Sequence, residues 1–346
     1  MNERPVSASR NSSVNDQEWV LVVAYTPHFA HAVPVAHTDK LLLRNSASRS
    51  DLGGVIHDST PLPWHCLLES SLEQIAKAYL LAYQQRNTAL APFASSVRYS
   101  ENNVLMEFPD GSWDTVTRTE GEPLILSDPV LGTAAIFITV FHLDTPSFLA
   151  VRLGITEGQI HEVEHILSTR RNVSTPPEPF GNAHSFVRDP AMLAPVAPEE
   201  RMSRDAMVRM ANAYFSTLEN NNGELRGGIR FTPDCVRHEN GLKRGDVEAD
   251  FRLGPYRAND RVRDRDFILV DERRSIVLAR GFIDHKGALD TFTLTDGTPG
   301  RSIFREPHTW ALLEAFKMRS GAISAIEAVF YGAPYYQRSP WTAPRA

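Results

Sequence analysis

The motif with the most specific chemistry is His161-Glu162-Val163-Glu164-His165, which fits the H-E-x-x-H pattern. On a helix, the two histidines would lie one turn apart on one face and could bind zinc, with Glu162 as general base. The segment follows Gly158 and has the pattern of a strand, however, and a matching segment at 324–328 contains no histidine. We therefore expect no metal site here, and we interpret the shared apolar and Glu positions as structural.

A second group of polar residues follows Phe231. Burial of its acidic and imidazole side chains in a pocket would raise the carboxyl pKa and bring a histidine close to neutrality, which suits removal of a proton next to a carbonyl group. The alternative is that Glu239-Asn240-Gly241 forms a turn and that Asp234 caps the local backbone. The group comprises Asp234, Arg237, His238 and Glu239.

A third group lies at the end of an expected strand. Asp284 and His285 are consecutive, so alternation along the strand puts them on opposite faces and at most one points into a pocket. His308 and Trp310 precede the last expected pair of strands and would line the same cavity. The alternative is that His285 only leads into a turn at Lys286-Gly287.

Composition excludes several other classes of protein. The chain has 346 residues, and 36 Lys and Arg against 42 Asp and Glu give a net charge of −6, which argues against a nucleic-acid partner. Asp residues interleave with the Arg-rich run 252–265 and cancel most of its charge. Two cysteines, Cys66 and Cys235, exclude a disulfide scaffold. There is no Gly-rich phosphate loop and no G-x-S-x-G elbow.

The sequence shows neither the apolar stretch of a membrane helix nor the features of a signal peptide. No stretch approaches the about 18 to 20 apolar residues of a membrane helix. The apolar run Trp19 to Tyr25 follows acidic residues, whereas a signal peptide begins with basic ones. We therefore expect a cytoplasmic protein, with no membrane partner.

Hydrophobic periodicity gives the same order of elements in two parts of the chain. Helical spacing comes first in each part, and strand-like runs follow at 135–141 and 148–153, then at 267–270, 275–279 and 325–330. Helices followed by strands predict an α+β fold, with helices on one face of a curved, largely antiparallel sheet. The helical positions are Leu72, Ile75, Ala76, Tyr79 and Leu80, then Met207, Met210, Ala211, Tyr214 and Phe215.

Three short blocks recur in the same order, which predicts an internal duplication. Ile75-Ala76-Lys77-Ala78-Tyr79 matches Met210-Ala211-Asn212-Ala213-Tyr214, residues 99–103 match 237–241, and 158–164 match 321–327. A proline-rich stretch between the copies is expected to be a linker. We therefore expect an extension over 1–65, a first domain over 66–171, a linker over 172–201 and a second domain over 202–346.

Each half resembles a SnoaL-like domain of the nuclear transport factor 2-like superfamily, and the whole is similar to tandem SnoaL-like proteins of fungi, which are mostly uncharacterised. The resemblance implies two cone-shaped domains, each a curved sheet closed by helices around a mostly apolar pocket. It also implies an internal pseudo-dimer within a monomer, or a homodimer. The stretches that carry it are Ser100-Glu101-Asn102, Gly111-Ser112-Trp113 and 148–164, then 234–241, 262–287 and 314–330.

The resemblance also suggests a reaction, because ketosteroid isomerase has this architecture and uses a carboxylate base with hydrogen-bond donors. We expect an isomerase, cyclase or dehydratase without cofactor or metal, acting on a small carbonyl compound of secondary metabolism. The second half is favoured, since the first lacks an Asp-His pair. The expected catalytic residues are Asp234, His238, Asp284 and His285, and the expected substrate-binding residues are Tyr214, Arg237, Glu239, His308 and Trp310.

Two alternatives remain open at this point. The chain could instead be a non-catalytic protein that binds a small molecule or a partner. Secretion is the alternative to a cytoplasmic location, because relatives often carry signal peptides.

Overall fold

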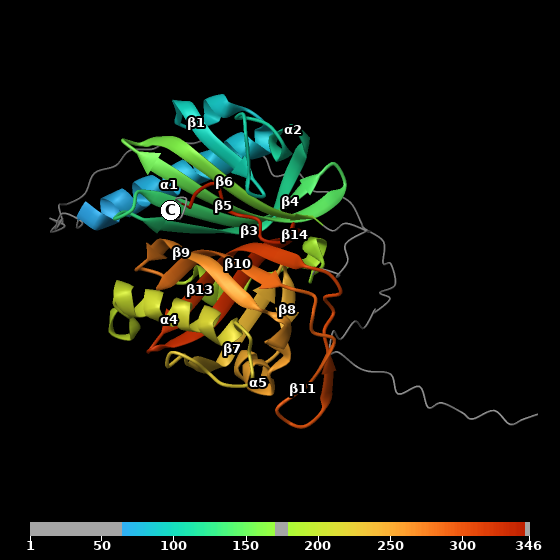
Figure 1. Cartoon of the computed structure of the whole chain (residues 1–346). Helices are drawn as coiled ribbons and strands as arrows, with labels where there is room; N and C mark the ends of the chain where they lie inside the picture. The colour runs from blue at the N-terminus through green and yellow to red at the C-terminus, as the bar shows by residue number, and fades with distance from the viewer. Residues whose placement is uncertain (1–63, 170–178, 343–346) are drawn as a thin grey trace, which may run out of the picture. The chain divides into compact units, whose positions relative to one another are not determined.

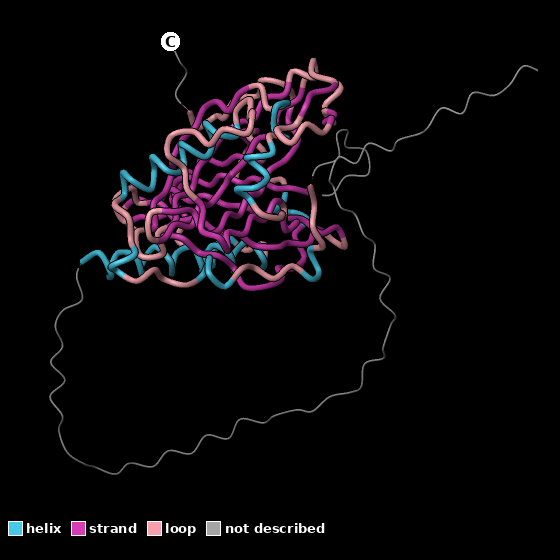
Figure 2. The backbone as a smooth tube through the Cα atoms, turned by 90° about the horizontal axis from the view of Figure 1, so that it is seen from below, coloured by secondary structure: helices cyan, strands magenta, loops and turns pink. Residues whose placement is uncertain are grey.

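The structure is a computed structural model that describes residues 64–169 and 179–342. Nearly all of the expected extension, 1–65, and the first part of the expected linker lie outside the described residues. Figure 1 shows the order of the elements, and Figure 2 shows the described backbone coloured by helix, strand and loop.

The first sheet is preceded by a long helix and has six strands. Its strand order is β2-β1-β6-β5-β4-β3, in which β1 and β6 run parallel and the other neighbours run antiparallel. The elements are α1 (Trp64–Gln85), β1 (Phe93–Glu101), β2 (Val104–Met106), α2 (Ser112–Thr115), β3 (Val116–Asp128), β4 (Thr133–His142), β5 (Thr145–Thr156) and β6 (Gln159–Thr169), with the 3₁₀ turn η1 (Thr88–Leu90) after α1.

The second sheet also has six strands, and its order β8-β7-β14-β13-β10-β9 has the same pattern of parallel and antiparallel neighbours. The elements are α4 (Arg204–Leu218), β7 (Phe231–Glu239), β8 (Leu242–Arg244), α5 (Val247–Leu253), η4 (Pro255–Ala258), β9 (Arg261–Asp271), β10 (Ile276–His285), β13 (His308–Arg319) and β14 (Ala322–Ala333), with the small hairpin β11 (Thr291–Thr293) and β12 (Pro299–Arg301). The predicted α+β class, with two curved and largely antiparallel sheets, is confirmed.

One helix closes each sheet, as the spacing of apolar residues predicts. Helix α4 begins after Ser203, whose hydroxyl accepts a hydrogen bond from the Ala206 N–H. Its buried face includes Met207, Ala211 and Tyr214, which join a core with the inner face of the second sheet. Helix α1 forms the equivalent core with the first sheet. No helix within 64–169 and 179–342 combines the length and apolar character needed to cross a membrane.

A third core joins the opposite faces of the two sheets. It contains Phe137 and Phe148 from the first sheet and Leu278 and Leu313 from the second. The described part of the expected linker packs against it through η2 (Ala183–Ser185) and α3 (Pro190–Leu193), with η3 (Pro198–Glu200) following. The two sheets therefore belong to one compact unit, and the boundaries at 171 and 202 stay a prediction.

Candidate functional site

The residues expected to form one site lie in separate environments. Asp234 lies on β7 with a side chain that is 69% exposed, and its carboxylate accepts hydrogen bonds of 2.9 and 2.6 Å from Arg319. Contacts with Thr232 and Arg319 hold the pKa of this carboxyl below its usual value. Asp234 thus belongs to a surface ion pair, and the structure does not bring it to the other candidates.

His238 faces away from its sequence neighbours Arg237 and Glu239, because alternate residues of a strand point to opposite faces. Its ring lies 5.5 Å from that of Phe186, in the segment between the two sheets. Burial lowers the pKa of His238. The structure therefore separates His238 from the interior of the second sheet.

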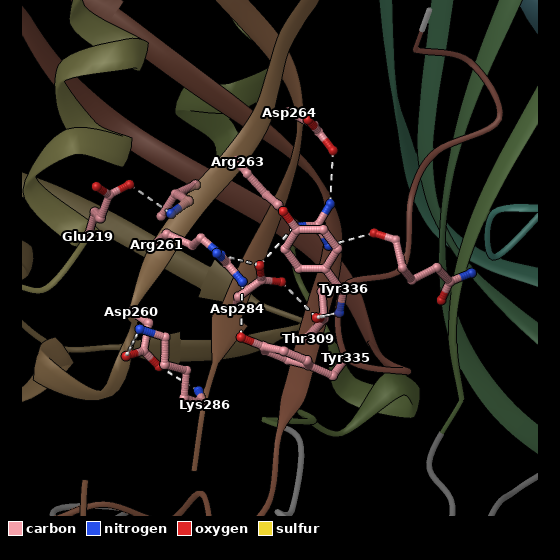
Figure 3. A network of polar contacts seen from close by, with 12 residues as sticks. Glu219, Asp260, Arg261, Arg263, Asp264, Asp284, Lys286, Thr309, Tyr335 and Tyr336 are labelled. Atoms are coloured by element: carbon pink, nitrogen blue, oxygen red, sulfur yellow. Dashed lines mark hydrogen bonds and ion pairs between the residues drawn. The ribbon is translucent and has the colours of Figure 1, made fainter. Parts of the chain in front are cut away.

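Asp284 is the anion of a buried ion cluster, shown in Figure 3. Its carboxylate accepts hydrogen bonds from Arg261 at 2.7 Å, Arg263 at 2.8 Å and Thr309 at 2.7 Å. Burial opposes its ionisation, but the hydrogen bonds from Arg263, Arg261 and Thr309 outweigh burial and hold its pKa below the usual value. The Tyr336 ring covers both arginines, at 4.6 and 4.7 Å. Every partner of this carboxylate therefore favours a fixed anion.

His285 lies on the opposite face of β10 from Asp284, as alternation predicts, and meets His308 and Trp310 there. Its Nε2 is 2.9 Å from the Asn259 amide oxygen, and its ring stacks on Phe304 with 3.5 Å between centroids. The rings of Trp310 and His308 lie at 4.9 and 6.0 Å. Burial, reinforced by the charge of His308, lowers the pKa of His285 to about 3. These side chains form an aromatic cluster in which the His285 ring is held neutral.

A cluster of polar side chains lies between α4 and strand β7 on the inner face of the second sheet. It contains Tyr214, Arg237 and Glu239. The Arg237 guanidinium is 1% exposed and donates to the Tyr214 hydroxyl at 3.1 Å. Its Nε lies 3.3 Å from the Glu239 carboxylate. Two further partners, Asp250 at 3.4 Å and the Tyr256 hydroxyl, come from α5 and η4. Sequence reasoning selected the first three residues but missed Asp250 and Tyr256.

The most unusual group in this interior is Glu314 on β13. It is 4% exposed, and burial raises its pKa to about 8, although the Arg237 charge acts against the rise. The Tyr214 hydroxyl contacts it. Glu314 is therefore mostly a neutral carboxylic acid at pH 7. The sequence carried a signal, because Leu312 and Phe316 flank Glu314 on the core-facing side of an alternating strand.

The H-E-x-x-H segment forms strand β6, as its sequence context predicts. His161 is exposed and His165 is buried, so the two histidines lie in different surroundings. Within the described ranges, no group of three or more His, Cys, Asp or Glu side chains is arranged to hold a metal ion.

Comparison with known proteins gives one family model and several solved structures. Residues 200–330 match the model described as "Domain of unknown function (DUF8021)". No curated protein matches the chain. AclR, a proposed hydroxylase from Streptomyces galilaeus, is 11% identical over 30% of this chain and 81% of its own, with a TM-score of 0.25. A proposed ketosteroid isomerase from Kribbella flavida is 21% identical over 36% of this chain and 94% of its own, with a TM-score of 0.22.

Proposed function

We propose that the interior of the second sheet is an acid-base site and that the protein is an isomerase, cyclase or dehydratase without cofactor. Its substrate would be a small carbonyl compound. The observation that carries the proposal is the buried Glu314, whose pKa of about 8 lies near neutrality, in contact with Tyr214. A group with such a pKa is present in both protonation states, so it can take a proton in one step and return it in the next.

The neighbours of Glu314 suit the charge that this chemistry produces. Removal of a proton next to a carbonyl group places negative charge on the carbonyl oxygen, and fixed donors stabilise that charge. Tyr214 and Arg237 supply such donors from α4 and β7, and both are held by their own contacts. Half-buried Asp250 and Tyr256 mark the side from which a substrate would enter.

The packing within one chain supports a monomer with an internal pseudo-dimer. The two sheets already cover each other through the third core. Without this contact, the apolar faces of the two sheets would need a second copy of the chain to cover them.

The test is rescue of a gene deletion followed by metabolite profiling. Wild type and the exposed control Glu306→Gln should restore the normal metabolite profile. With Glu314→Gln or Tyr214→Phe, a carbonyl compound should still accumulate. Asp234→Asn and His238→Ala should also rescue, since these residues lie outside the cluster. Melting temperatures of the purified variants separate a lost reaction from lost folding. Full rescue by Glu314→Gln would contradict the proposed role.

A second candidate function is a non-catalytic binding or interaction protein. The observation that favours it is the dense packing around Tyr214, whose ring lies 4.9 Å from Phe316 and 5.2 Å from Phe251. Rescue by both Glu314→Gln and Tyr214→Phe would support this function over catalysis.

A further inference from the structure

The first strand of the first sheet is paired over only part of its length. Strand β2 pairs with β1 at Tyr99 to Glu101, and β6 pairs with it at Phe93 and again from Arg98 onwards. Residues 94–97 of β1 have no register partner on either neighbouring strand. Such a segment offers backbone N–H and C=O groups with which another extended chain can pair. This part of β1 is therefore an open edge of the sheet.

The matching strand of the second sheet has the same interruption but is protected. Residues 232–235 of β7 also lack a register partner on both neighbouring strands. This segment contains Pro233, which has no backbone N–H, and the charged Asp234. Proline and charged side chains are the usual means by which proteins prevent further pairing at a sheet edge. The first sheet has Ser95 and Ser96 at the same two positions, so its open segment carries neither form of protection.

The edge strands next to these segments differ in the same direction. Strand β8 carries Lys243 and Arg244, whose charges discourage a further strand. Strand β2 has only apolar residues, and its Val104 and Leu105 are 55% and 52% exposed. An apolar, unprotected edge is a hazard for a protein unless it serves as a binding surface. The contrast between the two sheets therefore indicates that a strand binds to the first.

A groove beside the open segment has room for such a strand. Its volume is about 600 Å³, and it lies between the start of β1 and the chain that leaves β2. Phe93, Met106 and Phe108 supply apolar wall, and the two phenylalanine rings lie 4.7 Å apart. Glu107 is the one charged residue of this wall, is exposed, and makes no hydrogen bond or ion pair within the described ranges. The groove therefore suits a segment with apolar and basic side chains.

We propose that this groove is a docking site for a partner protein, which binds through an extended segment of alternating β-branched residues with a lysine or arginine. The segment adds a strand to β1 by exchanging backbone hydrogen bonds with residues 94–97. Its alternate side chains pack on the apolar wall, and its basic side chain pairs with Glu107. A second copy of this chain fits poorly, because its own open segment is the wall of a groove and does not project. The site is independent of the function proposed for the second sheet, since none of its residues belongs to the Glu314 cluster.

The test measures the fluorescence anisotropy of a labelled peptide, Lys-Val-Thr-Val-Thr-Val, mixed with the full chain. The same peptide with two alternate backbone amides N-methylated keeps every side chain but loses two donors of the strand ladder. We expect saturable binding of the first peptide and at least about ten-fold weaker binding of the second, the effect of two lost hydrogen bonds. Equal binding of the two peptides would show adhesion to an apolar surface and would overturn the proposal.

Two substitutions place the binding in the groove. Ser95→Pro introduces the residue that the second sheet has at the matched position, so the fold should accept it, and it removes a backbone donor. We expect it to weaken binding about ten-fold, whereas the control Ser95→Ala, which keeps the donor, should bind normally. Glu107→Lys should weaken binding about five-fold and strengthen binding of the matched peptide that begins with Glu.

Melting temperatures of the purified variants show whether Ser95→Pro is folded. If it is not, the N-methylated peptide and the charge reversal at Glu107 still decide the question. Absence of saturable binding, wild-type affinity in a folded Ser95→Pro variant, or no change of charge preference in Glu107→Lys would each overturn the proposal. Sedimentation velocity tests the other occupant: a wild-type dimer that Ser95→Pro dissociates would mean that a second copy, and not a partner protein, occupies the edge.

Discussion

Asn102 and Asn240 close matching turns of the two sheets and make the same pair of backbone hydrogen bonds. The Asn102 side chain accepts from Leu167 N at 2.8 Å and donates to Leu167 O at 3.1 Å. The Asn240 side chain accepts from Phe330 N at 2.9 Å and donates to Phe330 O at 3.0 Å. Both residues have positive φ, 49° and 44°, which asparagine tolerates better than most residues. Each therefore ties the first strand of its sheet to the last.

Removing either side chain should destabilise the fold. Asn102→Ala removes the side-chain partner of a part-buried N–H and C=O, and Asn240→Ala removes that of a buried pair. Each change also places alanine at positive φ. We expect each to lower the free energy of unfolding by about 2–4 kcal/mol. Urea denaturation measures the change. Asn222→Ala, at an exposed position with one local hydrogen bond, is the control and should change stability by less than about 0.5 kcal/mol. Equal effects of all three variants would contradict the interpretation.

These matched turns show why the recurring blocks could be found in the sequence. The blocks 99–103 and 237–241 contain the asparagines, and the blocks 158–164 and 321–327 begin the strands that pair with them. Local backbone requirements keep such residues recognisable when the surrounding core has changed. We propose that the two sheets arose by duplication of one domain, which the shared strand order supports.

The contact between the sheets gives the next prediction. Glu164 is buried and accepts hydrogen bonds from Arg280 at 2.7 Å and from Arg152 at 2.9 Å. Glu164→Gln leaves two buried guanidinium groups short of a negative charge, so we expect a loss of about 3–5 kcal/mol in the free energy of unfolding. The exposed pair of Asp234 and Arg319 is the control: Asp234→Asn should cost about 0–1 kcal/mol. Denaturation by urea compares them, and similar losses would refute the prediction.

The candidate site was predicted less well than the fold, and strand alternation explains much of the difference. Arg237, His238 and Glu239 were grouped because they are adjacent in sequence, but alternation sends His238 to the other face of β7. Two partners of Arg237, Asp250 and Tyr256, come from α5 and η4, so no pattern around Arg237 identifies them. Glu314 could have been selected, since a Glu on the apolar side of an alternating strand is rare. Its contact with Tyr214 depends on how α4 packs against the sheet.

The pKa of Glu314 makes stability depend on pH in a defined direction. The pKa is about 8 in the folded protein and 4.5 for an unperturbed Glu. The folded state therefore holds a proton that the unfolded state has released, and stability falls as the pH rises from 4.5 to 8, then levels off. Glu314→Gln should remove this part of the slope, and Glu306→Gln, an exposed control, should keep it. Urea midpoints from pH 5 to 8 measure the slopes, and identical slopes in wild type and Glu314→Gln would rule out the shift.

His285 should make stability depend on pH in the opposite direction, and at lower pH than Glu314 does. Its pKa is about 3 in the folded protein, against 6.5 for an unperturbed histidine, because the ring is buried against Phe304. The unfolded state therefore takes up a proton that the folded state cannot, so stability falls as the pH drops from 6.5 towards 3. His285→Gln keeps a donor for Asn259 but has no ring to protonate, so this loss should be smaller in the variant.

The comparison for His285 uses slopes rather than absolute stabilities, because His285→Gln also removes ring packing on Phe304. His161→Gln, at an exposed position on β6, is the control and should retain the wild-type pH dependence. Thermal unfolding between pH 4 and 7 measures all three proteins. If His285→Gln and wild type lost stability in parallel as the pH fell, His285 would not be held neutral in the fold. A catalytic role as a cation would then become available to it.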